Sequence, residues 1–164
     1  WQNGRLQNSD GKSIRPLGTA QPAGALSNRL DFSKDIPPAM LGEGWNQPEA
    51  GHRWTTKHAV VFLKGAADGG DKHYTLTING SLNVDFFDQN QVTMMLKADD
   101  QAIGKHTFNE SGEFTVSQSF EGNFPGPIEL RLELDQTFRP SEAGNTTDSR
   151  ELGISVNRIQ LLYR

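Results

Sequence analysis

Apolar and polar residues alternate with a period of two over most of the chain, the pattern of half-buried β-strands. It is clearest in residues 128–134, IELRLEL, and along residues 74–78, where Tyr, Leu and Ile alternate with Thr. Residues 58–64, HAVVFLK, are apolar almost throughout, which indicates a strand covered on both faces. No window of about 12 residues carries the apolar stripe of a helix. The pattern therefore predicts an all-β protein.

Turn signals divide the remaining pattern into strands. Leu30 and Phe32 alternate with polar neighbours and predict a short strand. Asn79-Gly80 favours the two-residue turn of a β-hairpin, so the strand that begins near Tyr74 is expected to end there. The other predicted strands are the alternation of Leu82, Val84 and Phe86, and residues 92–96, 114–120, 128–134 and 154–162.

Eight or so short strands with one apolar face each need a second sheet to bury those faces. The predicted fold is therefore a two-sheet β-sandwich, and a jelly roll or a related Greek key is the commonest arrangement of this number of strands. The apolar positions of the strand patterns form the predicted core: Leu30, Val60, Phe62, Leu76, Ile78, Leu130, Leu132, Ile154 and Ile159. The strand at Leu30–Phe32 is expected to lie beside the last strand, because first and last strands of such sandwiches are commonly neighbours.

The chain of 164 residues has room for one domain. Residues 1–28 are polar and rich in Gly, Pro, Gln, Asn and Ser, so they are predicted to be a linker or an N-terminal arm whose deletion leaves the fold intact. Residues 29–164 form the predicted sandwich. Because the sequence opens with Trp rather than Met, we expect a piece of a longer protein.

Composition removes several classes of function. The formal net charge is −4 and no basic cluster is present, which argues against nucleic-acid partners. No stretch reaches the roughly 18 apolar residues of a membrane helix, so the chain is not expected to span a membrane. The absence of cysteine excludes thiol catalysis, disulfides and Cys-type zinc sites. No cofactor is predicted; Asp68-Gly69-Gly70-Asp71 is interpreted as a solvated turn, with a structural calcium site as the alternative.

One loop before the first long strand concentrates side chains of the kind that bind sugars. Residues 44–55 contain Trp45, Glu49, Arg53 and Trp54. Flat apolar rings can stack on the C–H faces of a sugar, while planar charged groups meet its hydroxyls. The alternative is structural: the Trp rings close the open end of the sandwich and the charged groups pair with neighbouring loops.

A second polar loop, residues 137–154, contains Asp148 and Arg150 after a run of small capping residues. Such residues hydrogen-bond their own backbone and hold a long loop in one shape. If both loops lie at one end of the sandwich, the natural pairings are Glu49–Arg150 and Arg53–Asp148. The candidate carbohydrate-binding residues are therefore Trp45, Glu49, Arg53, Trp54, Asp148 and Arg150.

These two loops also carry a family resemblance. The pattern GW..PE.GHRWT and the closing segment PSEAGNTTDSRELGI resemble an extracytoplasmic β-sandwich domain of unknown function, which occurs at the ends of bacterial membrane phosphoglycerol transferases and related glycosyltransferases. The resemblance covers about residues 40–164. Such domains are in turn similar to jelly-roll carbohydrate-binding modules.

The resemblance implies a non-catalytic, extracytoplasmic glycan-binding module of a larger bacterial cell-envelope enzyme, at the periplasm or the cell surface. Its partners would be a glycan or polysaccharide and the attached catalytic or membrane domain. Two alternatives stay open: a purely structural or interaction domain that binds no sugar, and an autonomous glycan hydrolase or lyase. The last is disfavoured because no catalytic constellation is recognisable in the sequence.

Overall fold

The computed structural model describes residues 26–144 and 146–164. Residues 1–25, most of the predicted arm, lie outside the described part. The last residues of the arm contact the domain: the carbonyl of Ser27 accepts from the Lys64 amide at 2.9 Å, and that of Asn28 accepts from the Leu161 amide at 2.8 Å. The described chain thus meets both sheets before its first strand begins.

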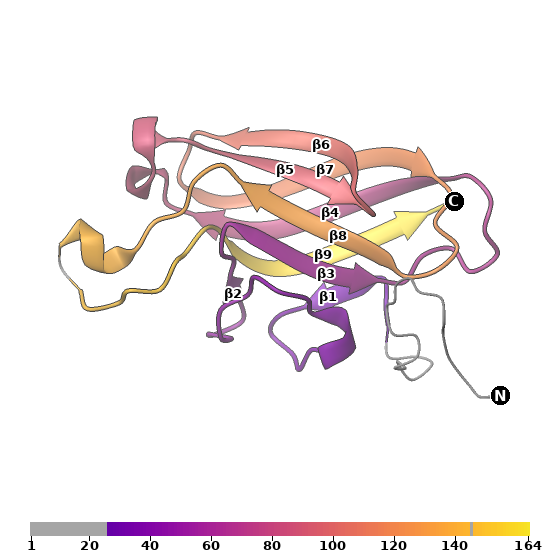
Figure 1. Cartoon of the computed structure of the whole chain (residues 1–164), viewed down its shortest axis with the longest axis horizontal. Helices are drawn as coiled ribbons and strands as arrows, with labels where there is room; N and C mark the ends of the chain where they lie inside the picture. Colours follow the sequence, from indigo (N-terminus) through magenta and orange to yellow (C-terminus); the bar gives the residue numbers. More distant parts are fainter. Residues whose placement is uncertain (1–25, 145) are drawn as a thin grey trace, which may run out of the picture.

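The described strands form two antiparallel sheets packed face to face (Figure 1). The five-stranded sheet has the order β1 (Arg29–Asp31), β9 (Ser155–Tyr163), β4 (Lys72–Leu82) and β7 (Gly112–Gly122), with β2 (Arg53–Trp54) also paired to β9. The four-stranded sheet has the order β3 (His58–Leu63), β8 (Ile128–Leu134), β5 (Val92–Ala98) and β6 (Gln101–Phe108).

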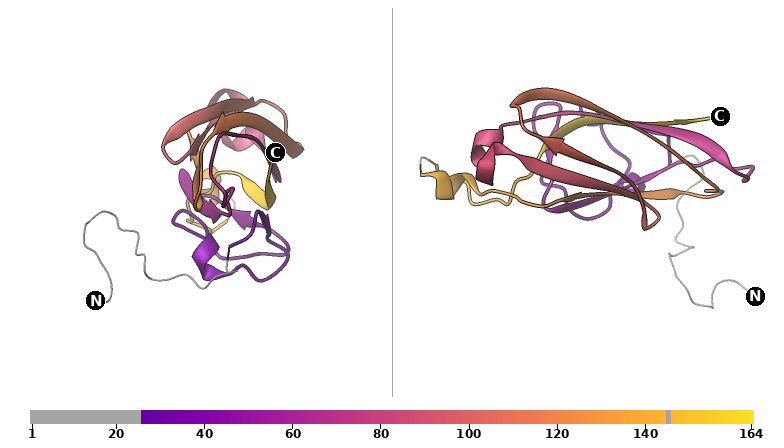
Figure 2. Two further views of the ribbon diagram at one scale, coloured as in Figure 1. Left: turned by 90° about the vertical axis from the view of Figure 1, so that its right-hand side faces the viewer. Right: turned by 90° about the horizontal axis from the view of Figure 1, so that it is seen from above.

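Figure 2 shows the two layers end-on and from above. If the two-residue β2 is left out and the other strands are renumbered along the chain, the strand orders are 1-8-3-6 and 2-7-4-5. These are the orders of a jelly roll. The predicted all-β, two-sheet jelly-roll sandwich is confirmed. Helical structure in the described residues is limited to the 3₁₀ turns η2 (Pro38–Met40), η3 (Val84–Phe86), η4 (Asp88–Asn90) and η5 (Pro140–Ala143).

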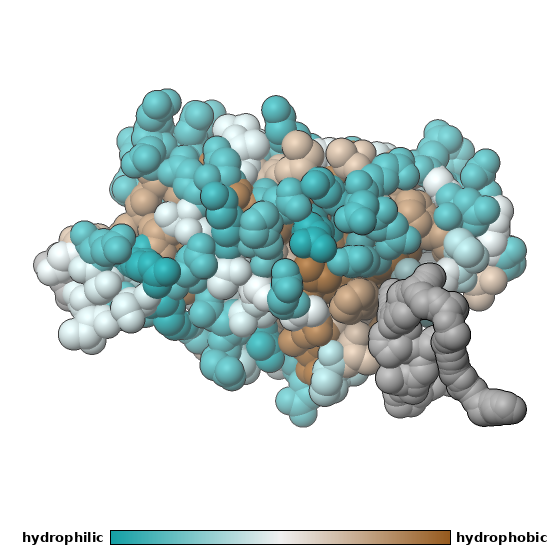
Figure 3. Space-filling model, viewed as in Figure 1, coloured by the Kyte–Doolittle hydropathy of each residue, from teal (hydrophilic) through white to brown (hydrophobic). Residues whose placement is uncertain are grey.

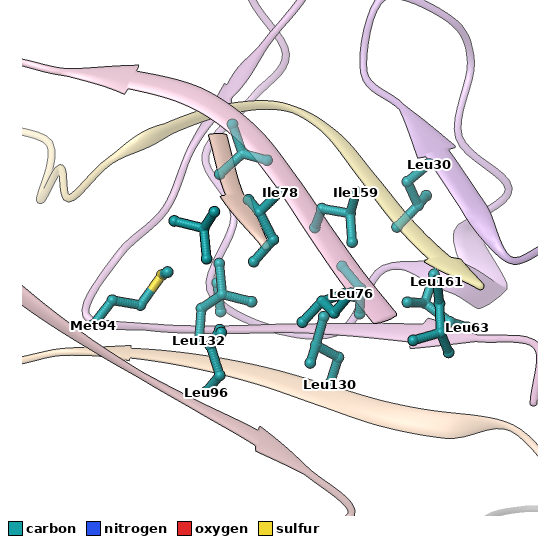
Figure 4. Packing of buried hydrophobic residues seen from close by; sticks show 14 of the residues in the cluster. Leu30, Leu63, Leu76, Ile78, Met94, Leu96, Leu130, Leu132, Ile159 and Leu161 are labelled. Carbon is teal, nitrogen blue, oxygen red and sulfur yellow. The ribbon is translucent and has the colours of Figure 1, made fainter. Parts of the chain in front are cut away.

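The core follows from the alternation. In β4, β5 and β8 every second side chain is buried between the sheets. Figure 4 shows Leu76 and Ile78 of β4 pointing toward Leu130 and Leu132 of β8. Leu30 pairs with Ile159, so the expected adjacency of the first and last strands is confirmed. The predicted core residues that join the central cluster are Leu30, Leu76, Ile78, Leu130, Leu132, Ile154 and Ile159.

Two predicted core residues lie on the other face of β3. Ala59, Val61 and Leu63 point into the core, so the pleat turns Val60 and Phe62 outward. Val60 is still buried, because the segment before β2 lies over it: its carbonyl accepts from the Gly42 amide at 2.8 Å. Phe62 is half-buried. The uniform apolar run of β3 correctly indicated cover on both faces and could not say which face is the core.

The predicted turn at Asn79-Gly80 is wrong, because β4 continues through it to Leu82. Gly80 serves close packing instead. A Cβ at this position would lie 2.1 Å from the Ser155 carbonyl oxygen and 2.7 Å from Cζ of Phe114. The strand predicted from Leu82 to Phe86 is also wrong, since Asn83 caps η3 through a 2.9 Å bond from the Asp85 amide to Oδ1.

Candidate functional site

The two predicted loops lie at one end of the sandwich. In Figure 1 and the right view of Figure 2, the segment with η5 and the segment with η3 and η4 occupy the same end. The first loop reaches them through a tight turn, in which Glu49 and His52 exchange two backbone hydrogen bonds of 2.9 Å. Gly51 adopts φ +84° there, a conformation that favours glycine. This turn sets the Glu49 carboxylate beside the His52 ring, 4.0 Å from its Nε2.

The second loop is an ordered excursion closed by backbone pairing. Phe138 and Leu152 exchange hydrogen bonds of 2.9 and 2.8 Å at its base. Nearer its tip, the Ser141 amide donates to the Asp148 carbonyl at 2.7 Å, and the Asp148 amide donates to Thr146 Oγ1 at 3.0 Å. The expectation that small polar residues hold this loop is met at Thr146. Asp148 and Arg150 therefore have fixed positions.

Glu49, Asp148 and Arg150 form a charge cluster, which we call the clamp. Arg150 Nη1 donates to Glu49 Oε2 at 2.7 Å. Its Nη2 donates to Asp148 Oδ2 at 2.8 Å, and its Nε donates to Oδ1 of the same carboxylate at 3.0 Å. The predicted Glu49–Arg150 pairing is thus confirmed. Because the three side chains are 28–39% exposed, the clamp borders solvent.

The clamp changes the acidity of its members. Hydrogen bonds from the Arg150 side chain and backbone amide lower the pKa of Asp148 to about 2. The same bonds, together with the one to Glu49, raise the pKa of Arg150 above its already high ordinary value. Arg150 and Asp148 therefore both carry full charge at neutral pH.

The predicted Arg53–Asp148 pairing is wrong. Arg53 Nη1 donates instead to the carbonyl of Asn46 at 3.2 Å, and Asn46 Nδ2 donates to the carbonyl of Glu151 at 3.1 Å. The reason is local: Arg150 lies two positions from Asp148 and occupies both oxygens of that carboxylate. Asn46 therefore joins the two loops, and Arg53 holds the Asn46 carbonyl within the first loop without entering the clamp.

The two tryptophans have different environments. Trp45 packs on the core, with its ring centroid 5.0 Å from that of Phe32, and its indole Nε1 donates to the Val60 carbonyl at 2.9 Å. Trp54 is half-buried and makes edge-on contacts with His52 and Phe138, each at a centroid separation of 6.1 Å. The structural alternative therefore describes Trp45 well, whereas Trp54 belongs to a larger aromatic group.

That group contains residues the sequence did not single out. Phe86 of η3 stacks on Phe138 with ring centroids 4.6 Å apart and an interplanar angle of 8°. Phe87 meets Phe138 edge-on at 5.4 Å. Phe86 is 43% exposed. On the face seen in Figure 3, hydrophilic residues cover most of the surface. In the sequence, Phe86 belongs to an alternating pattern that predicts a strand, so nothing there marks it as a site residue. Its contact with Phe138 exists only because the fold brings η3 against that residue.

The arrangement has the chemistry that a polyhydroxylated ligand requires. The exposed Phe86 ring offers a flat apolar surface, and the contacts Phe86–Phe138–Trp54–His52–Glu49 lead from it to the clamp. Within the clamp, Arg150 commits Nε, one hydrogen of Nη1 and one of Nη2, so two of its five N–H groups remain available. The carboxylates supply further acceptors.

The residues of the calcium alternative do not fit that ion. Asp68 Oδ2 pairs with Lys72 Nζ at 3.2 Å, and the turn offers only one other carboxylate, Asp71. Calcium takes six to eight oxygen ligands, about 2.3–2.6 Å away. Across residues 26–144 and 146–164, no group of three or more His, Asp or Glu side chains could hold a metal ion. Over the same ranges, no helix is long and apolar enough to cross a membrane.

Comparison with known proteins gives structural likeness without sequence kinship. No protein-family model and no curated protein matches the sequence. A family 35 carbohydrate-binding module from Clostridium thermocellum is 9% identical, with a TM-score of 0.44, over 82% of this chain and 97% of that module.

Two enzymes contain a similar part. The acetyl xylan esterase of Butyrivibrio proteoclasticus is 11% identical with a TM-score of 0.46, over 85% of this chain and 33% of the esterase. A cycloisomaltooligosaccharide glucanotransferase of Paenibacillus sp. is 14% identical with a TM-score of 0.45, over 84% of this chain and 18% of the enzyme. The chain therefore spans a third or less of these enzymes, and the likeness concerns the fold alone.

Proposed function

We propose that this chain is a non-catalytic glycan-binding module whose site lies at the loop end of the sandwich. The observation that carries the proposal is the exposed Phe86 ring, stacked on Phe138 and connected by aromatic contacts to the clamp. An apolar ring of this exposure loses unfavourable contact with water when a sugar face covers it. Fixed charged groups nearby can bind the hydroxyls without first being ordered, which lowers the entropic cost of binding.

The site residues then take separate roles. Phe86 and Trp54 provide the apolar surface, and Glu49, Asp148 and Arg150 provide donors and acceptors to the hydroxyls. Trp45 and Arg53, the other two candidates from the sequence, act on the loop itself: their hydrogen bonds to the Val60 and Asn46 carbonyls hold its shape. Glycan binding would use the two N–H groups that Arg150 leaves unpaired.

The proposed setting is a bacterial cell envelope. The sequence resemblance of residues 44–55 and 140–154 to domains of membrane phosphoglycerol transferases supports an extracytoplasmic position, at the periplasm or cell surface. In this setting the chain would accompany a catalytic or membrane domain in the same polypeptide. Its task would be to hold that enzyme near a glycan.

The test is a glycan-array screen followed by calorimetric titration of the best oligosaccharide with three proteins. Phe86→Ala should weaken binding about five- to thirtyfold, because stacking of a ring on a ligand is worth about 1–2 kcal/mol. Tyr163→Ala is the matched control: Tyr163 is 42% exposed, lies on β9 and has no contact with the clamp. Its affinity should equal that of the wild type.

The purely structural alternative rests on a specific observation, the ion pairs of Arg150 with both Glu49 and Asp148. In that case the clamp only joins the loops, and no oligosaccharide of the array binds at high micromolar concentration. A binding affinity that is unaffected by Phe86→Ala would also contradict the proposed site.

A further inference from the structure

A polar depression of about 600 Å³ lies on the outer face of the five-stranded sheet. It is bounded by the β1 end, the turn that contains Gly51, and the facing parts of β4, β7 and β9. The side chains that matter are Asp31, Asn79, Glu113, Thr115, Asn157 and Arg158. Neither the predicted loops nor the clamp supplies any of them.

The strand register explains why these groups converge. Asp31 of β1 pairs with Arg158 of β9, Arg158 pairs with Asn79 of β4, and Asn79 pairs with Thr115 of β7. Directly opposed residues of antiparallel strands point to the same face. One row of polar side chains therefore crosses the four strands at the floor of the depression.

A β-bulge adds another side chain to this row. The pairing of β4 with β9 shifts between Asn79 and Gly80, which oppose Arg158 and Val156, so Asn157 is the extra residue. Asn157 and Arg158 are consecutive and both exposed, which a regular strand with one covered face does not permit. The backbone around the bulge is held by the Phe32 amide, which donates to the Asn157 carbonyl at 3.0 Å.

Much of the hydrogen-bonding capacity in the depression is unused. Asn79 Nδ2 donates to Thr115 Oγ1 at 2.8 Å. The side-chain oxygen Oδ1 of Asn79 and the hydroxyl hydrogen of Thr115 therefore remain available. Within the described residues, the side chains of Glu113, Asn157 and Arg158 have neither a hydrogen bond nor an ion pair. Free amides, a guanidinium and carboxylates are suited to hydroxyl groups, which both donate and accept.

The charge of the depression selects against anions. Among the residues that line it, Asp31 and Glu113 contribute two negative charges against the one positive charge of Arg158. Lys34 also acts on Asp31 but lies outside the lining. Hydrogen bonds from the Ser33 hydroxyl (2.6 Å) and amide (3.0 Å) lower the pKa of Asp31, so it is ionised at neutral pH. An acidic sugar or a phosphate would meet this excess negative charge, whereas an uncharged sugar would not.

We propose that this depression is a second glycan site, which takes an uncharged, hydroxyl-rich oligosaccharide. It goes beyond the loop-end site because none of its groups is shared with the clamp or with Phe86. Asn157 and Arg158 bind hydroxyls from the bulge, and the row of Asp31, Asn79 and Thr115 forms the floor.

The experiment is calorimetric titration of the whole chain with three neutral hexasaccharides, cellohexaose, xylohexaose and maltohexaose, and with hexagalacturonic acid. Arg158→Ala and Asn157→Ala should each weaken binding to this site about five- to tenfold, the usual effect of removing one or two hydrogen bonds. Lys105→Ala, an exposed cation on the other sheet, is the matched control and should have no effect. Thermal melts check that every variant is folded.

The two proposals fail in different ways. If Arg158→Ala weakens a neutral hexasaccharide while Phe86→Ala does not, this depression is a glycan site and the loop-end site is wrong. If Phe86→Ala removes all binding and neither bulge variant has an effect, the second site is overturned while the proposed function stands. Binding of hexagalacturonic acid as tight as that of the neutral sugars would also overturn the second site. So would the absence of binding to every hexasaccharide, whereas the loop-end site is tested separately with the best oligosaccharide of the array.

Discussion

The guanidinium of Arg150 donates to the carboxylate of Glu49 at 2.7 Å, although 101 positions of sequence separate the two residues. The bond joins the turn at residues 49–52 to the loop that returns toward β9. Because Arg150 simultaneously holds Asp148, one side chain fixes the relative position of two loops that carry the proposed site.

Replacing Arg150 by Ala should lower the free energy of unfolding by about 0.5–2 kcal/mol. This is the usual contribution of partly exposed, charge-assisted hydrogen bonds to stability. The substitution also leaves the carboxylates of Glu49 and Asp148 without their cation. Arg158 is exposed and makes no hydrogen bond or ion pair in the described structure, although its charge acts on Asp31. Arg158→Ala should therefore shift the thermal melt much less than Arg150→Ala. Equal melts for all three proteins would show that the clamp does not stabilise the fold.

Acid should weaken the fold through Asp148. Its pKa is lowered from 3.8 to about 2 in the folded protein, so the unfolded chain binds the proton more readily. The resulting stabilisation is present above pH 4 and is lost as the pH falls from about 4 to about 2. Urea titrations of the wild type and Asp148→Asn over this range measure it: the variant should lack this part of the acid dependence. Parallel curves for the two proteins would contradict the assignment.

Leu132 and Phe62 should differ strongly as sites for truncation. Leu132 is fully buried between the sheets, so Leu132→Ala should cost about 2–5 kcal/mol through lost burial and the cavity left behind. Phe62 points away from the core and is half-buried, so Phe62→Ala should cost about 1 kcal/mol. Chemical denaturation measures the free energy of unfolding of both variants. An equal loss of stability would mean that Phe62, and with it the opposite face of β3, points into the core.

Gly80 should not tolerate even a methyl group. The Cβ of Gly80→Ala would meet the Ser155 carbonyl oxygen and the Phe114 ring, so β4 and β9 must separate at the bulge. Gly126→Ala is the control, because a Cβ there has no atom within 4 Å. We expect a clearly lower melting temperature for the first variant only. An unchanged melt for Gly80→Ala would contradict the close approach.

The features that were predictable are those in which local pattern and tertiary burial agree. In β8 and in the first part of β4, alternation alone located the strands and the buried leucines, because one face of each is covered. In β6 only Ile103 is buried, so the strand has no apolar period to detect. The turn that precedes it uses Asp99 and Asp100 with positive φ, in place of the glycine-containing dipeptides that normally identify such hairpins.

The candidate site was predictable to the extent that it depends on charge and turn chemistry. Opposite charge on two ordered loops was enough to expect the Glu49–Arg150 pair. The partner of Arg53 was not predictable, because it is a backbone carbonyl and every residue has one. The stacking of Phe86 on Phe138 depends on the packing of η3 against a loop some 50 positions away, which no local pattern encodes.

The most direct test of the loop-end site is a titration of the ¹⁵N-labelled chain with its best array oligosaccharide, observed at the indole N–H resonances. Trp54 lies in the aromatic group of the site, whereas the Trp45 indole is bonded to the Val60 carbonyl on the core side. The chain has three tryptophans, and Trp54→Phe and Trp45→Phe identify the signals of these two residues among the three indole signals. We predict a saturable shift of the Trp54 signal with that of Trp45 unmoved. A saturated complex in which the Trp54 signal stays in place would contradict the proposed site.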